Sequence, residues 1–194
     1  MPNDRPAEAR HDPARDRTHD RELARRLASK VKLLVLDVDG VLTDGGLYYD
    51  AEGRIMKRFD VQDGLGMKMA QEAGLKLAVI TGLDSPAVSA RIRELGVTDY
   101  HFGHTHKPPL LESIRVKHGL EFAQMAYLGD DWVDVSVMRM VGLPLAVANA
   151  QPEVKRLAAW VTGRGGGHGA VREAIAFILE ARGLLEAQWR RWGG

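Results

Sequence analysis

Short runs of apolar residues recur along the chain, and each gives way to polar residues or glycine before a stretch with helical spacing. The first run, residues 31–36 (V-K-L-L-V-L), ends at Asp37 and is typical of a buried parallel strand. Further strands are expected at residues 75–80, 125–128 and 143–147, and near 100–102. Helices are expected over residues 63–73, 86–95, 107–118, 131–141, 152–159 and 169–182. This alternation predicts an α/β fold with a Rossmann-like doubly wound parallel sheet covered by helices on both faces.

One segment breaks this alternation directly after the first strand. The L-Y-Y stretch, the turn-forming D-A-E-G and the following residues 54–59 predict a β-hairpin over residues 47–59. The glycine-rich stretch 163–169 (G-R-G-G-G-H-G) is expected to be a flexible loop before the last helix. The hairpin is therefore an insertion in an otherwise regular α/β domain.

The two ends of the chain differ from this core. Residues 1–30 mix arginines with acidic residues and hold few apolar residues before Leu23, so we expect a disordered charged tail that ends in one or two helical turns. Residues 183–194 form a basic, amphipathic C-terminal tail. We expect this tail to pack against a neighbouring subunit, without stable membrane association. The folded domain is thus expected over residues 31–182.

The composition excludes several classes of protein. Among 194 residues, 27 are Lys or Arg and 26 are Asp or Glu, which lacks the basic excess of a nucleic-acid-binding protein. Cysteine is absent, which excludes disulfides, thiolate metal sites and cysteine nucleophiles. No apolar run approaches the roughly 18 residues of a membrane span. Residues 1–30 lack the apolar region of a signal peptide, so we expect a cytoplasmic protein.

The strongest chemical signal lies where the first strand ends, in the stretch D-V-D-G-V-L-T-D-G at residues 37–45. The functional crevice of such a sheet lies at the carboxyl ends of its strands. Asp37 and Asp39 are two residues apart there, so both carboxylates can face the same side. Such a pair repels unless a cation lies between its members, and a hard ion such as Mg²⁺ suits carboxylate oxygens. The alternative is a simple strand-to-loop turn.

Three further strand ends carry polar residues. Asp130, Asp131 and Asp134 follow the strand at 125–128, and this cluster can meet the first pair around one metal. Asp134 can hold the loop in place, and the alternative for Asp130 or Asp131 is to cap the next helix. Thr81, followed by Gly82, offers a hydroxyl and a backbone amide. Lys107 stands at the start of a helix, which is unfavourable for the helix dipole unless an anion is bound there.

Along the chain, the carboxylate pair comes first, then the hydroxyl, the lysine and the second acidic group. This order resembles the haloacid dehalogenase superfamily of phosphohydrolases. The resemblance implies that Asp37 attacks phosphorus and that Asp39 acts as general acid and base. It implies Mg²⁺ held by Asp37, the backbone carbonyl of Asp39 and Asp130. Further roles follow from it: Thr81 and Lys107 bind phosphoryl oxygens, and Asp131 and Asp134 support the ligands.

The spacing of these motifs leaves no room for a cap domain, because only the hairpin, two helices and one strand lie between them. Within the superfamily the chain resembles the capless 3-deoxy-D-manno-octulosonate 8-phosphate (KDO 8-phosphate) phosphatases of lipopolysaccharide synthesis. The resemblance covers about residues 31–182 and rests on the stretches at 37–45, 60–64, 80–82, 129–134 and 169–173. It implies a homotetramer in which hairpins pair between subunits and the C-terminal segment reaches a neighbour's site.

The same resemblance implies a set of contacts to a phosphorylated sugar acid. The positions are Asp39, Asp60, Val61, Gln62, Asp63, Gly64, Lys68, Thr81, Gly82, Arg91 and Lys107. A structural alternative exists for three of them: Asp63 caps the following helix, and Lys68 and Arg91 are surface charges.

Two departures from the family pattern leave the substrate open. Leu83 and His168 stand where the family usually has arginines, which suit a sugar carboxylate because arginine binds it bidentately. Another sugar phosphate, such as a nonulosonate 9-phosphate, is therefore an alternative substrate. A non-catalytic module with the same fold is a further alternative, disfavoured by the intact Asp37, Asp39 and Asp130.

The histidines beside Lys107 form a separate cluster, H-x-x-H-x-H, made by His101, His104 and His106. Its spacing matches none of the usual structural zinc patterns, so we expect one or two of these histidines to line the substrate pocket.

Overall fold

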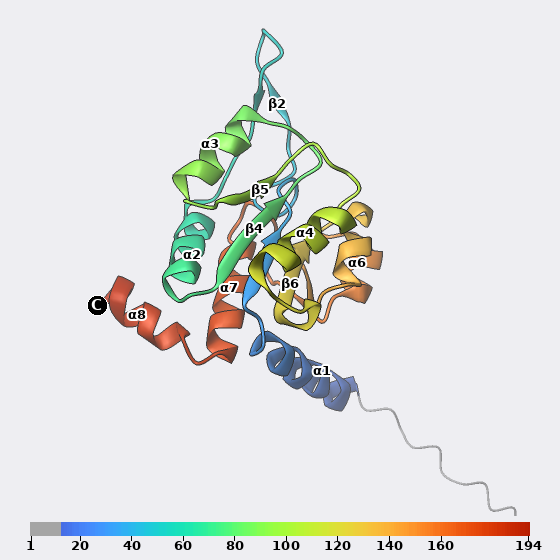
Figure 1. Ribbon diagram of the computed structural model, residues 1–194, viewed down its shortest axis with the longest axis vertical. Coiled ribbons are helices and arrows are strands. Elements are labelled where there is room, and N and C mark those ends of the chain that lie inside the picture. Colours follow the sequence, from blue (N-terminus) through green and yellow to red (C-terminus); the bar gives the residue numbers. More distant parts are fainter. Residues whose placement is uncertain (1–12) are drawn as a thin grey trace, which may run out of the picture.

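The computed structural model describes residues 13–194 and has a six-stranded sheet at its centre (Figure 1). The strand order is β5-β4-β1-β6-β7-β8, and every neighbouring pair is parallel. The strands are β1 Leu33–Leu36, β4 Lys76–Ile80, β5 Asp99–His101, β6 Met125–Gly129, β7 Leu143–Ala146 and β8 Trp160–Val161. Apart from the exposed Lys76 at the start of β4, the residues of the central strands are buried and almost all are apolar, so the predicted doubly wound sheet is confirmed.

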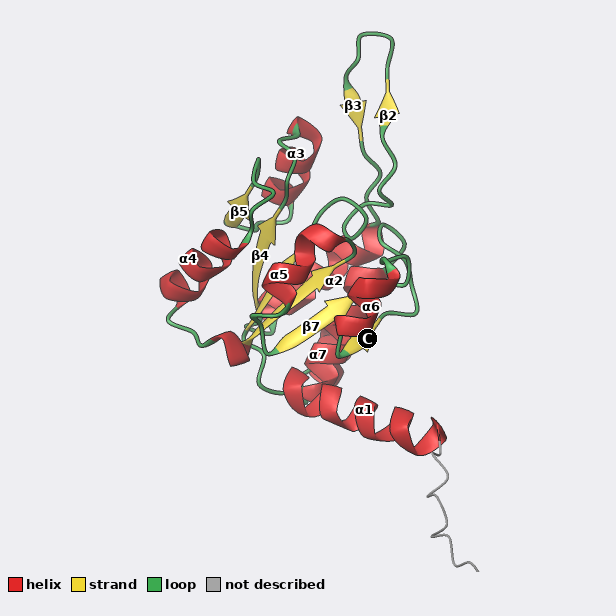
Figure 2. Cartoon of the chain, turned by 90° about the vertical axis from the view of Figure 1, so that its right-hand side faces the viewer, coloured by secondary structure: helices red, strands yellow, loops and turns green. Residues whose placement is uncertain are grey.

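Helices cover both faces of this sheet. On one face α7 packs against α2 and α1, and on the other α5 packs against α4 and α6 (Figure 2). The helices are α1 Pro13–Ala28, α2 Val61–Glu72, α3 Pro86–Glu94, α4 Pro108–His118, α5 Val135–Met138, α6 Pro152–Leu157, α7 Ala170–Ala181 and α8 Leu185–Gly193, with 3₁₀ turns η1 Phe122–Gln124 and η2 Trp132–Asp134. The single helix expected over 131–141 is therefore divided into η2 and α5. The edge strand β8 was not expected, because its two residues are too few to give a pattern.

The hairpin insertion is the only element between β1 and α2, as expected. Strands β2 Tyr48–Tyr49 and β3 Ile55–Met56 pair antiparallel, with Tyr48 opposite Met56. Figures 1 and 2 show the hairpin projecting well beyond the sheet. An isolated bridge between Thr43 and Phe59 closes its base. A hairpin this short has little stability of its own, so its base and any partner must hold it.

Helix α1 lies in the segment for which we expected a disordered tail, and for residues 13–28 the structure differs from that expectation. Ala24 and Ala28 are fully buried, because their small side chains let the helix approach α7 closely. Arg25 also pairs with Glu180 of α7 at 2.8 Å. This contact between α1 and α7 leaves no clear pattern in the sequence, since alanine contributes little to an apolar pattern. The part of the expectation that concerns residues 1–12 lies outside the described residues.

The C-terminal tail expected over residues 183–194 contains helix α8. Its side chains reach back to α2, where Trp192 Nε1 donates to Glu72 at 3.0 Å and Arg191 pairs with the same carboxylate at 2.7 Å. Trp189 and Trp192 remain exposed. Within the described part of the chain, no helix is long and apolar enough to span a bilayer.

Candidate active site

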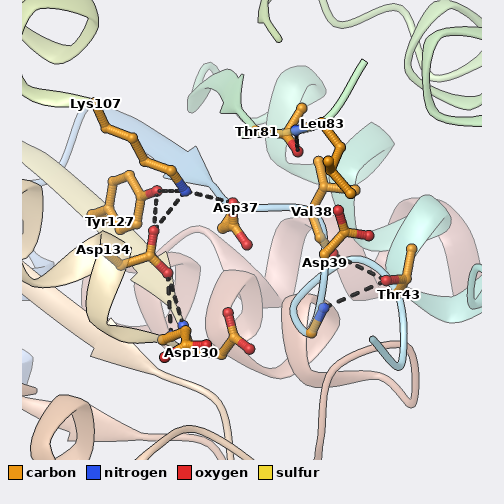
Figure 3. A network of polar contacts seen from close by, with 12 residues as sticks. Asp37, Val38, Asp39, Thr43, Thr81, Leu83, Lys107, Tyr127, Asp130 and Asp134 are labelled. Atoms are coloured by element: carbon orange, nitrogen blue, oxygen red, sulfur yellow. Dashed lines mark hydrogen bonds and ion pairs between the residues drawn. The ribbon is translucent and has the colours of Figure 1, made fainter. Parts of the chain in front are cut away.

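The loop after β1 presents Asp37 and Asp39 at the carboxyl end of the sheet, as the sequence predicted. A hydroxyl holds this loop: Thr43 Oγ1 donates to the carbonyl of Val38 at 3.3 Å and accepts the N–H of Gly40 at 3.4 Å (Figure 3). Gly40 adopts φ +90°, which a side chain would strain. The turn therefore leaves Asp37 nearly buried and Asp39 partly exposed on one side of the loop.

The second acidic loop approaches the first closely enough to form one site. A Cβ on Gly40 would lie 2.0 Å from Asp130 Oδ2, so only glycine permits this contact. Ligand oxygens of Asp37, Asp130 and Asp134 all lie within 4.8 Å of one another. The two acidic loops therefore meet at one site, as the sequence predicted.

Lys107 lies in the middle of this cluster. Its side chain is 1% exposed, and Nζ donates to Asp37 Oδ1 at 2.6 Å, Asp134 Oδ1 at 2.7 Å and the Tyr127 hydroxyl at 3.0 Å (Figure 3). Burial alone would lower the pKa of Lys107, but the two carboxylates raise it above its usual value. The lysine is therefore a fixed cation. Its backbone lies at the start of helix α4, and its ammonium group contacts carboxylates of other segments.

Asp134 is fully engaged by protein donors. Its Oδ1 accepts from Lys107 and from the Tyr127 hydroxyl at 2.7 Å, and its Oδ2 accepts the N–H of Asp130 at 3.0 Å. The Asp131 carboxylate, by contrast, is exposed and caps η2 by accepting the N–H of Trp132 at 2.6 Å. Asp134 consequently orients the Asp130 loop. Asp131 caps a helical turn, as the sequence analysis allowed for this residue.

The remaining carboxylates fit a divalent cation. Within residues 13–194 no protein donor contacts the side chain of Asp130. Burial, together with the charges of Asp37 and Asp134, raises the pKa of Asp130 to about 8. Burial and the charge of Asp134 raise the pKa of Asp37 to about 7, against the lowering effect of Lys107. Asp37 and Asp130 are hard oxygen ligands whose repulsion a cation such as Mg²⁺ relieves. The contribution of the Asp39 carbonyl stays a prediction.

These pKa values predict how the metal-free protein responds to pH. Both carboxyl groups have folded-state pKa values above their unfolded value near 4, so the stability they contribute is present at acid pH and is lost as pH rises through about 7 to 8. In EDTA we expect the melting temperature to fall by at least about 3 °C between pH 5.5 and 8.5. Mg²⁺ should reduce this fall, because it binds the deprotonated carboxylates.

The control for this pH effect is Asp130→Asn, measured by calorimetry under the same conditions. Its melting temperature should depend less on pH and respond less to Mg²⁺. The same fall in the variant as in the wild type would show that other groups cause it.

Thr81 follows β4, the neighbour of β1, and lies across from Asp37 (Figure 3). Its side chain is buried, and Oγ1 accepts the N–H of Leu83 at 3.4 Å. Gly82 lies between them. The side chain of Leu83 is exposed, so this loop offers a hydroxyl and no charge at the position where the resemblance led us to expect an arginine.

The expected sugar contacts at residues 60–64 form a second group around the start of α2. The N-cap is Asp60, which accepts the N–H of Gln62 at 2.6 Å, so the alternative role of Asp63 as cap is wrong. Asp63 is buried and accepts the N–H groups of Gly169 at 3.2 Å and Arg172 at 2.7 Å, which ties α2 to the start of α7. Burial raises its pKa to about 6.

Other members of this group contact neighbouring helices and loops. Gln62 accepts from Arg164 at 2.8 Å, and Arg91 pairs with Glu94 at 3.0 Å. A Cβ on Gly64 would lie 2.2 Å from Arg91 Nη2, so glycine makes room for that guanidinium. Lys68 and Val61 are exposed. Their contact with a substrate stays a prediction.

The histidine cluster does not assemble as a metal site in the part of the chain that the structure describes. His104 and His106 are exposed, whereas His101 lies on β5 with Nε2 3.9 Å from Asp99 Oδ1. Asp99 in turn binds Lys117 and His118. The geometry therefore gives no support to a zinc site at these histidines.

Sequence reasoning missed several residues at this site. Tyr127 lies in an apolar strand whose pattern predicts a core residue, although its hydroxyl binds Lys107 and Asp134. The stretch expected to be a flexible loop packs on the first acidic loop: a Cβ on Gly166 would lie 1.8 Å from the carbonyl oxygen of Gly40. Asn149 joins the two loops, donating to that carbonyl at 3.1 Å and accepting the N–H of Gly166 at 2.6 Å. No periodicity signals such contacts.

Fold and site together define a haloacid dehalogenase-like hydrolase, and the family model of that description matches residues 103–175. The chain is 42% identical to the 3-deoxy-D-manno-octulosonate 8-phosphate phosphatase of Haemophilus influenzae over 153 residues, which are 79% of this chain and 85% of the relative. It is 40% identical to the Escherichia coli K12 phosphatase of the same name over 159 residues, 82% of this chain and 85% of the relative. The chain therefore belongs to the family of 3-deoxy-D-manno-octulosonate 8-phosphate phosphatases.

Solved structures agree with this assignment. A putative HAD superfamily (subfamily III A) hydrolase from Legionella pneumophila superposes with a TM-score of 0.88 at 39% identity, over 90% of this chain and 96% of that one. The phosphatase from Moraxella catarrhalis, solved with magnesium, phosphate and KDO, superposes with a TM-score of 0.85 at 36% identity, over 87% and 97% of the two chains. The predicted haloacid dehalogenase-like fold without a cap domain is thus confirmed.

Proposed function

We propose that the protein is a Mg²⁺-dependent phosphatase that hydrolyses KDO 8-phosphate in lipopolysaccharide synthesis. The observation that carries the proposal is the group of Asp37, Asp130 and Asp134 at the carboxyl ends of the strands, where Asp37 and Asp134 bind the buried Lys107 ammonium. Relatives at about 40% identity are named for this activity, and the Moraxella catarrhalis structure holds magnesium, phosphate and KDO.

The chemistry begins at Asp37, whose free carboxylate oxygen attacks phosphorus. The bond from phosphorus to the sugar oxygen breaks, and that oxygen takes a proton from Asp39. Water then gives a proton to Asp39 and attacks the aspartyl-phosphate, which releases inorganic phosphate and restores Asp37. Asp39 fits both steps because its side chain is partly exposed on the same loop.

The other residues position and neutralise the phosphoryl group. Lys107 brings a positive charge to within 2.6 Å of the nucleophile, and the Thr81 hydroxyl lies on the neighbouring strand end. Asp37, the Asp39 carbonyl and Asp130 would hold Mg²⁺, which supplies positive charge that offsets repulsion between a carboxylate and a phosphate. Asp134 keeps Lys107 and the Asp130 loop in place.

The sugar acid is expected to contact residues near the start of α2, together with Lys68, Gly82 and Arg91. Leu83 and His168 replace two arginines of the family pattern, so nonulosonate 9-phosphates are the second candidate substrates. Arg58 lies beside the second of these positions, with Nη1 3.4 Å from His168 Nδ1. This guanidinium keeps a cation at the glycine-rich loop and supports a carboxylate-bearing substrate.

The proposal includes a homotetramer in the cytoplasm. The hairpin exposes Tyr48, Tyr49, Ile55 and Met56 on its two-residue strands and Leu47 just before them, which favours pairing with another hairpin. The C-terminal segment exposes Trp189 and Trp192 beside α2. These apolar surfaces are the ones that subunit contacts would cover.

The function is tested by phosphate release from KDO 8-phosphate, nonulosonate 9-phosphates and hexose phosphates, each with Mg²⁺ and with EDTA. We expect preference for KDO 8-phosphate by at least about tenfold in kcat/KM, and loss of activity in EDTA that added Mg²⁺ restores. Preference for a nonulosonate would assign the changed specificity to Leu83 and His168. No release from any substrate by folded protein would favour the non-catalytic module.

A further inference from the structure

A second buried lysine lies near the site and has no part in the chemistry above. Lys57 directly follows β3 in the returning arm of the hairpin, and its side chain is 1% exposed. Its Nζ lies 2.5 Å from Asp39 Oδ1. A buried ammonium is costly unless it is paired, so this contact fixes the position of both groups.

The contact engages only one oxygen of Asp39. Within the described residues, Lys57 is the sole side chain that donates to this carboxylate, and it donates to Oδ1. The carboxylate is 29% exposed, so it remains accessible to substrate and water. A carboxylate held at one oxygen has a defined orientation for proton transfer at the other, which is the requirement for a general acid and base.

The two residues that follow Lys57 are themselves anchored. Phe59 forms a bridge with Thr43, whose hydroxyl holds the loop of Asp39. The neighbouring Arg58 donates to the carbonyl of Gly167 in the glycine-rich loop. The stem of the hairpin therefore has a fixed place relative to the loop that it contacts, and Lys57 cannot swing away as a surface lysine does.

We infer that Lys57 is a positioning residue for Asp39, through which the hairpin completes the acid and base machinery of its own subunit. The inference rests on the proposed phosphatase function. It gives the hairpin a second role beside subunit contact: removing Lys57 should impair proton transfer to the leaving oxygen without affecting the attack by Asp37.

The leaving group separates these two effects. A sugar alkoxide needs the proton of Asp39 when it leaves, whereas the p-nitrophenolate of p-nitrophenyl phosphate leaves with little help. For Lys57→Gln we expect kcat/KM on KDO 8-phosphate to fall by about 10²-fold or more, and on p-nitrophenyl phosphate by less than about fivefold. Lys57→Arg, which retains the cation, should recover part of the loss on the sugar phosphate.

Lys30→Gln is the matched control, because Lys30 is exposed at the opposite ends of the strands, before β1. Equal losses on both substrates, or a Lys57→Gln variant within about threefold of wild type on both, would overturn the inference. If Lys57→Gln does not fold, Lys57→Met, which keeps the buried stem, is compared on the same two substrates. A wild-type enzyme that releases phosphate from neither would instead refute the proposed function, and the inference with it.

Discussion

Replacing Asp37 by asparagine is expected to abolish phosphate release from KDO 8-phosphate, with a loss in kcat of at least about 10⁴-fold. The amide has the size of the carboxylate but no nucleophilic oxygen, so the aspartyl-phosphate cannot form. The variant should fold normally, because burial already raises the pKa of Asp37 to about 7 and a neutral group is readily accommodated there. Lys107 keeps its contact with Asp134 at 2.7 Å.

Three measurements check this expectation. Steady-state phosphate release gives the loss, and the melting temperature in EDTA should equal or exceed that of wild type at pH 8. Acid-quenched wild-type enzyme should carry a phosphoryl group on the peptide that contains Asp37, and the variant should not. Asp20→Asn, an exposed substitution on α1, serves as the control. Activity of the Asp37→Asn variant above about one tenth of wild type would refute the nucleophile assignment.

Much of the fold could be predicted because its elements leave local signals. The apolar run that forms β1 contains only buried residues, and the position of Asp37 at its end follows from that pattern. Parallel pairing places the ends of β4 and β6 beside it, which is why Thr81 and Asp130 could be assigned to the same site. Only the last one or two turns of helix α1 were expected, because the helix docks through alanines, which carry little apolar signal.

The parts of the site that escaped prediction depend on contacts between distant segments. Its apolar neighbours in the sequence predict that Tyr127 is a core residue. Its part in the site becomes visible only in the fold, where Lys107, 20 residues away in the chain, contacts its hydroxyl. Gly166 touches the backbone of Gly40, a contact for which neither segment has a pattern. Lys57 lies in the mixed polar and apolar stretch 54–59, which predicts one arm of a hairpin and nothing about the partner of the lysine. Chain topology, rather than local sequence, brings these groups together.

The buried cation gives the largest expected effect on stability. Lys107→Met keeps the unbranched stem of the side chain but leaves Asp37 and Asp134 without the ammonium that both contact. Removing one partner of a buried ion pair costs about 3–5 kcal/mol, a large part of the stability of a typical domain. We expect a loss of this order in the free energy of unfolding at pH 8, measured by urea denaturation in EDTA, and a fall in kcat of at least about 10²-fold.

The pH dependence identifies the cause of that destabilisation. Lys107 lowers the pKa of Asp37, so its removal lets this carboxyl group take up a proton more readily. Protonation removes the unpaired charge, and the destabilisation should therefore be smaller at pH 5.5 than at pH 8.5. A cavity or a packing defect would cost the same at both pH values. Lys30→Met is the control for loss of a lysine, and an equal destabilisation at both pH values would show that packing, and not charge, is what Lys107 provides.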